Sequence, residues 1–135
     1  MRGANVTTTV RWLSGITMAL VLLQAVLIGQ ALYLGDPARI ALHGWIGNLT
    51  FVGVIVLAAL VIIGVRRGEL SRPALGLGLL IALLTVAQIG LGYSGRAGGM
   101  PAALHIPNGV LIATLLAALL TVSFWPSPSA SQSWP

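Results

Sequence analysis

The chain contains two histidines, and both lie in the same short sequence pattern. One Ala-Leu-His run ends at His43 and is followed four residues later by Gly47; a second ends at His105 and is followed four residues later by Gly109. Neutral imidazole nitrogens bind metals, and histidine is a standard ligand of heme iron. Each glycine shares a helix face with its histidine, where it leaves room for the edge of a flat macrocycle. The pattern predicts a bis-histidine site for one heme b, with His43 and His105 on the iron.

Two other interpretations of the histidine pair stay open at this point. The histidines could be ordinary interfacial polar residues that bond to carbonyl groups or lipid headgroups without any cofactor. Each could instead bind the magnesium of another tetrapyrrole, such as a chlorophyll. A single histidine near a helix end would favour the interfacial interpretation. The matched pair, each with its glycine, favours heme.

The composition places these residues in a membrane. Hydrophobic residues make up 57% of the 135 residues and charged residues 7%, which a soluble domain of this length would not carry. A bilayer-spanning helix needs about 20 apolar residues, and four stretches qualify: residues 12–34, 40–65, 74–93 and 102–124. We therefore expect one all-α domain over residues 1–135, an integral membrane four-helix up-and-down bundle. The Pro/Ser-rich tail, residues 126–135, is expected to be disordered.

The positive charge predicts the orientation of this bundle. All of it is arginine, and two arginines, Arg39 and Arg96, fall in the loops on one side. The other five lie on the opposite side: Arg2, Arg11, Arg66, Arg67 and Arg72. By the positive-inside rule, both termini are cytoplasmic in a bacterial inner membrane. The basic balance thus reflects topology and not nucleic-acid binding, and the absence of cysteine excludes thiolate ligands and iron–sulfur clusters.

The two halves of the chain follow one plan. The order Gln, Gly, Tyr, loop, Ala-Leu-His runs from Gln24 to His43 and again from Gln88 to His105. This order predicts two similar helix pairs, in which the histidines lie at matched depth about one turn below the outer face. Gln88 lies nearest that depth, so it could line a heme or quinone pocket; buried amides more commonly tie helices together.

Other polar residues could complete the site. Arg39 precedes His43 by one turn and Arg96 lies in the second outer loop, so either could pair with heme propionates. Four polar residues near the histidines could supply supporting hydrogen bonds: Asn48, Thr50, Asn108 and Thr114.

This doubled pattern, from about Leu20 to Leu120, resembles one half of a heme A synthase-type protein. It is also similar to small bacterial four-helix membrane proteins of the same plan. The resemblance implies a four-helix bundle whose second and fourth helices each provide a heme ligand, here His43 and His105. The chain departs from the family in having one bundle, no cysteine and no second histidine pair, so oxidation of a heme methyl group is not implied.

A small membrane cytochrome b that transfers electrons at the outer face is the expected function, with no catalytic activity of its own. Leu57 and Leu119, two heptads below the histidines, cannot bind a second heme, and one heme cannot span the hydrocarbon core of about 30 Å. Electrons would therefore enter and leave near the outer face or through a partner. Besides the lipid bilayer, quinone or other subunits of a membrane complex could be that partner. The alternative is a cofactor-free accessory subunit of a larger respiratory or photosynthetic complex; transport is disfavoured because the spans lack charged residues.

Overall fold

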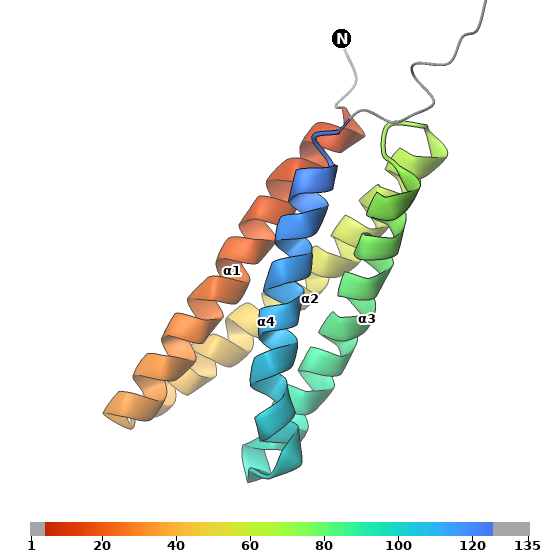
Figure 1. Ribbon diagram of the computed structural model, residues 1–135. Helices are drawn as coiled ribbons and strands as arrows, with labels where there is room; N and C mark the ends of the chain where they lie inside the picture. The colour runs from red at the N-terminus through yellow and green to blue at the C-terminus, as the bar shows by residue number, and fades with distance from the viewer. Residues whose placement is uncertain (1–4, 126–135) are drawn as a thin grey trace, which may run out of the picture.

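The computed structural model describes residues 5–125, which form a bundle of four helices (Figure 1). The helices are α1 (Val6–Leu34), α2 (Pro37–Arg66), α3 (Arg72–Ser94) and α4 (Met100–Val122), and the short 3-10 helix η1 (Gly95–Ala97) joins α3 to α4. Within this described part there is no strand, which confirms the predicted all-α four-helix bundle. The prediction of a disordered tail falls on residues 126–135, outside the described residues.

Local sequence signals set where the helices begin and end. The side chain of Asn5 accepts a backbone N–H from the first turn of α1, which satisfies one of the donors that a helix start leaves unpaired. Gly35 ends α1 in the left-handed conformation, with φ of 63°, which glycine adopts without steric cost. The side chain of Asp36 caps the start of α2 as that of Asn5 caps α1, by accepting a backbone N–H of the first turn. Pro37 is the first residue of α2, where the missing N–H costs nothing. The helix α4 continues through Pro107.

The helices are long and apolar enough to cross a membrane. Each has 23 or more residues and contains a strongly apolar segment, and about 20 apolar residues suffice to span the hydrocarbon core. Large apolar side chains such as Leu22, Leu83 and Val110 are exposed on the outside of the bundle. Water would oppose such a surface, whereas lipid accommodates it. The chain is therefore a multi-pass membrane protein in contact with the bilayer.

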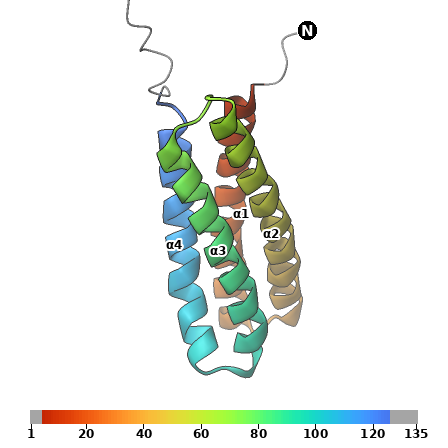
Figure 2. The same ribbon diagram turned by 90° about the vertical axis from the view of Figure 1, so that its right-hand side faces the viewer.

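The two ends of the bundle differ in their connections. The start of α1, the α2–α3 connection and the end of α4 lie together at what we call the terminal end (Figures 1 and 2). The α1–α2 and α3–α4 connections lie at the opposite end, which carries both histidines and is called the histidine end. In Figure 1, the lower ends of α1 and α4 lie farther apart than their upper ends.

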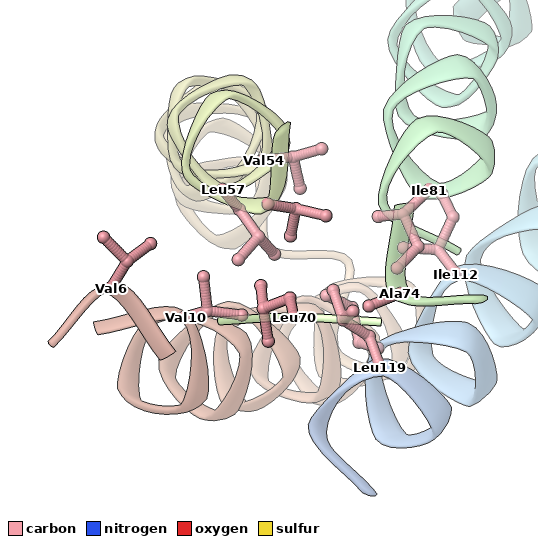
Figure 3. Close-up of a cluster of buried hydrophobic side chains, with 11 residues drawn as sticks. Val6, Val10, Val54, Leu57, Leu70, Ala74, Ile81, Ile112 and Leu119 are labelled. Atoms are coloured by element: carbon pink, nitrogen blue, oxygen red, sulfur yellow. The ribbon is translucent and has the colours of Figure 1, made fainter. Parts of the chain in front are cut away.

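The apolar core extends from the middle of the bundle to the terminal end (Figure 3). Eleven buried hydrophobic side chains form one cluster: Val6, Val10, Val54, Leu57, Val61, Leu70, Ala74, Ile81, Ile112, Leu116 and Leu119. Towards the histidine end, the buried apolar residues in the described part are Leu27 and Ala31, both from α1. Packing of apolar side chains thus holds one end of the bundle, and polar contacts take over at the other.

Side chains from neighbouring elements also lock the terminal end. The Arg11 guanidinium donates to the main-chain oxygen of Ser123, at 3.1 Å from Nε and 2.6 Å from Nη2. It also lies over the Phe124 ring, 4.2 Å from its centroid, which is a cation–π distance. The Thr7 hydroxyl donates to the main-chain oxygen of Glu69 at 3.0 Å. These contacts join α1 to the end of α4 and to the α2–α3 connection.

Candidate functional site

The two histidines lie close together although they come from different helices. His43 is on α2 and His105 on α4, two helices that are diagonal to each other because each packs on α1 and α3. Their ring centroids are 6.0 Å apart, and the ring planes meet at 68°. Both residues are partly buried. The structure therefore brings together the only imidazoles of the sequence from positions 62 residues apart (105 − 43).

The main chain of α1 orients His43. Its Nδ1 lies 3.0 Å from the main-chain oxygen of Gln24. A carbonyl oxygen only accepts, so neutral His43 carries its proton on Nδ1 and leaves the Nε2 lone pair available. Histidines that bind metals are commonly held in this way, with the second ring nitrogen bonded to a carbonyl or carboxylate. This hydrogen bond therefore leaves Nε2 of His43 unused.

A side-chain network orients His105 instead. The Gln88 amide nitrogen lies 3.2 Å from Nε2 of His105. Asn108 donates to the Gln88 side-chain oxygen at 2.7 Å and to the main-chain oxygen of Leu84 at 3.0 Å. Because Asn108 donates to that oxygen, the Gln88 NH₂ group must face His105, and Nε2 of His105 accepts. Its proton is then on Nδ1, which is buried and has no hydrogen-bond partner among residues 5–125.

Gly47 and Gly109 each lie against a glutamine of the preceding helix. A Cβ at Gly47 would lie 3.1 Å from the Gln24 side-chain oxygen, and one at Gly109 would lie 3.1 Å from the Gln88 side-chain nitrogen. Both distances are closer than ordinary van der Waals contact. The same pair of residue types thus meets in each of the two helical hairpins, α1–α2 and α3–α4. The repeated order of residues in the sequence therefore corresponds to a repeated contact in the structure.

A third glycine, Gly92, contacts the site without having been identified from the sequence. A Cβ there would lie 3.0 Å from Cε1 and 3.4 Å from Nδ1 of His105. The imidazole ring therefore rests on the backbone of α3, where a side chain would stand. Gly92 follows Gln88 by one helical turn and so shares its face. That spacing is the signal that could have identified it.

The two arginines of the histidine end bond to side chains beside them. Arg39 forms an ion pair with Asp36, with 2.9 Å between Nε and Oδ2, and also donates to the side-chain oxygen of Gln30. The Arg96 guanidinium lies 4.7 Å from the centroid of the Tyr93 ring. Both supply positive charge at the end where the histidines lie, and within the described residues neither bonds to an imidazole.

The site brings together two imidazoles as candidate metal ligands. Within residues 5–125 no group of three or more His, Cys, Asp or Glu side chains is placed to hold a metal ion, whereas a structural zinc ion takes four ligands. Heme iron needs only axial ligands from the protein. Since an imidazole nitrogen lies about 2 Å from its metal, two imidazoles on opposite sides of one metal have ring centroids roughly 6 Å apart. The ring centroids of His43 and His105 lie at about that distance, 6.0 Å, while Nε2 of His105 bonds to Gln88.

Comparisons with protein-family models, with curated proteins and with solved structures found no match for this chain. Its function must therefore be inferred from the chemistry of the histidine site.

Proposed function

We propose that this protein is a small membrane cytochrome b that binds one heme b between His43 and His105. The observation that carries this proposal is the ring-centroid separation of 6.0 Å between two histidines from diagonal helices. The proton positions support it, because hydrogen bonding leaves Nε2 of His43 with its lone pair available and gives His105 the same tautomer.

The remaining residues of the site would hold and surround the cofactor. Gly47 and Gly109 carry no side chain on the helix faces next to the histidines, and the side chains of Gln24 and Gln88 lie against them. Arg39 and Arg96 would supply positive charge for the propionates, and Gln88 would line the pocket. The bound heme would supply one-electron transfer.

The position of the site limits the path of the electrons. The side chains of Leu57 and Leu119 are buried in the apolar core of the terminal end. A second bis-histidine heme has no ligands there, and one heme does not span a hydrocarbon core of about 30 Å. We therefore place electron entry and exit at the face of the histidine end, through quinone or a protein partner.

A reduced-minus-oxidised absorption spectrum of the purified protein tests the proposal. We expect an absorption band that shifts on reduction in the wild type and is lost in the double variant His43→Ala/His105→Ala, which has no axial ligand. Thr114→Ala is the matched control, because it also removes a polar side chain but at an exposed position of α4. Wild-type protein that is colourless after expression with ample heme would refute the proposal.

A cofactor-free accessory subunit of a larger respiratory or photosynthetic complex is the second candidate. It is favoured by the hydrogen bonds that already engage both histidines, since these bonds join α1 to α2 and α3 to α4. Buried polar contacts between membrane helices stabilise association on their own. Copurification with large subunits, together with unchanged activity of that complex in the double histidine variant, would support this candidate over the cytochrome.

The orientation in the membrane gives a separate prediction. The sequence contains no cysteine, so single cysteines can be added at the two ends: Ser71→Cys at the start of α3 and Ala97→Cys in η1. Because arginine is more frequent at the terminal end, that end should be cytoplasmic. A membrane-impermeant maleimide should label position 97 in intact cells, and position 71 only after permeabilisation. The reverse result would place the histidine site on the cytoplasmic side.

A further inference from the structure

We infer that the two histidines are unequal ligands: His43 is the permanent ligand of the iron, and His105 exchanges with a small diatomic ligand such as carbon monoxide. This inference rests on the proposed function and adds a ligand-binding position to it. It arises from the different groups that hold the two imidazoles.

The hydrogen-bond partner of His43 is a main-chain oxygen, which cannot rotate away from the imidazole as a side chain could. Its Nδ1 bonds to the main-chain oxygen of Gln24, which lies in the middle of α1 and moves only with that helix. This bond stays in place when Nε2 binds a metal, since it uses the other ring nitrogen. It also increases the basicity of Nε2. The hydrogen bond and the metal bond therefore support each other.

His105 is held through the nitrogen that would have to bind the metal. Its Nε2 accepts from the Gln88 amide at 3.2 Å, and Asn108 keeps that amide in place at 2.7 Å. Ligation by His105 must first break this hydrogen bond. If the proposed heme were bound, a diatomic ligand would take the place of His105, and Nε2 of His105 would then accept from the Gln88 amide again. No proton or electron is transferred in this exchange.

The repeat supplies an internal control for this difference. Gln24 and Gln88 occupy equivalent places, because each side chain lies against the glycine that follows a histidine. The side-chain amide of Gln24, however, donates to the Thr50 hydroxyl at 3.0 Å and does not bond to an imidazole. Only the second hairpin therefore has an amide that competes with iron for its histidine.

Single histidine variants test the inequality through heme content and carbon monoxide binding. We expect ferrous His105→Ala to retain heme as a five-coordinate species that binds carbon monoxide directly, and His43→Ala to lose most of its heme. If the wild type binds no heme, the proposed function fails. If the wild type binds six-coordinate heme but both variants lose it equally, or His105→Ala loses more, the inference is overturned while the proposed function stands.

The paired variants Gln88→Leu and Gln24→Leu test the competing hydrogen bond. Without the Gln88 amide, His105 should stay on the iron, and the dissociation constant for carbon monoxide should rise roughly fivefold, the factor for one hydrogen bond. Gln24→Leu removes the equivalent amide and should leave that constant unchanged. An unchanged or lower constant in Gln88→Leu would overturn the inference.

Nitrogen-15 spectra of the heme-free protein provide a measurement that needs no cofactor. Both wild-type imidazoles should be protonated at Nδ1, and Gln88→Leu should shift the Nε2 resonance of His105 alone. A wild-type His105 protonated at Nε2 would show that the Gln88 amide does not donate to it, and would overturn the inference even if the variants proved unstable.

Discussion

Leu119→Ala is expected to lower the free energy of unfolding by about 2–5 kcal/mol, the usual range for a leucine removed from a close-packed core. The Leu119 side chain has no exposed surface and belongs to the apolar cluster of the terminal end. The change would leave a cavity among atoms of several helices, and the lost packing contacts have no replacement. Reversible unfolding of the purified protein in mixed micelles would measure the difference.

Leu83→Ala is the matched control for this prediction. Leu83 lies on α3 with 65% of its surface exposed, on the outside of the bundle, where lipid or detergent replaces the lost atoms. Its substitution should change the free energy of unfolding by about 0.5 kcal/mol or less. Equal losses from the two truncations would mean that the cluster at the terminal end does not hold the bundle together.

Gly92→Val is expected to displace His105. A Cβ at this position would lie 3.0 Å from Cε1 of the imidazole, so the ring must move away from α3 and lose its bond with Gln88. Overpacking of this kind costs about 1–3 kcal/mol of stability. If the proposed heme is bound, the spectrum should become that of His105→Ala. Thermal unfolding and the reduced spectrum would measure the two effects separately.

Gly90→Val controls for the change in helix propensity. Gly90 is on the same helix, and no heavy atom lies within 4 Å of the Cβ it would gain. This variant should retain the wild-type spectrum and most of the stability. If Gly90→Val and Gly92→Val behaved alike, the close approach of Gly92 to His105 would have no consequence.

The number and type of helices could be predicted from the sequence, but not where each one begins. Apolar runs identify the part of a helix that crosses hydrocarbon, whereas a helix continues until a cap ends it. The first span was expected from residue 12, yet α1 begins at Val6, directly after the Asn5 cap. The second was expected from residue 40, and α2 begins at Pro37. In both cases, the cap was a better guide than hydropathy.

The residue types of the site could be predicted, while the difference between its two halves required the structure. The repeat predicted similar surroundings for both histidines. In the first hairpin Thr50 accepts from Gln24, whereas the same place in the second hairpin is occupied by Ile112, which has no hydroxyl. Gln88 bonds instead to Asn108 and His105. Which amide turns to which partner depends on the spacing between helices, and a single sequence does not contain that spacing.

The buried apolar side chains are distributed unevenly along the bundle, so the α1–α2 pair and the α3–α4 pair are joined more firmly at the terminal end than at the histidine end. Apolar packing and the Arg11–Ser123 contact join the two hairpins at the terminal end, whereas few buried apolar side chains hold them at the other. Opening between the hairpins near the histidines therefore breaks fewer contacts than global unfolding does. Under the proposed function, a heme dissolved in the bilayer would therefore enter between the two helix pairs at the histidine end, while the terminal end stays closed.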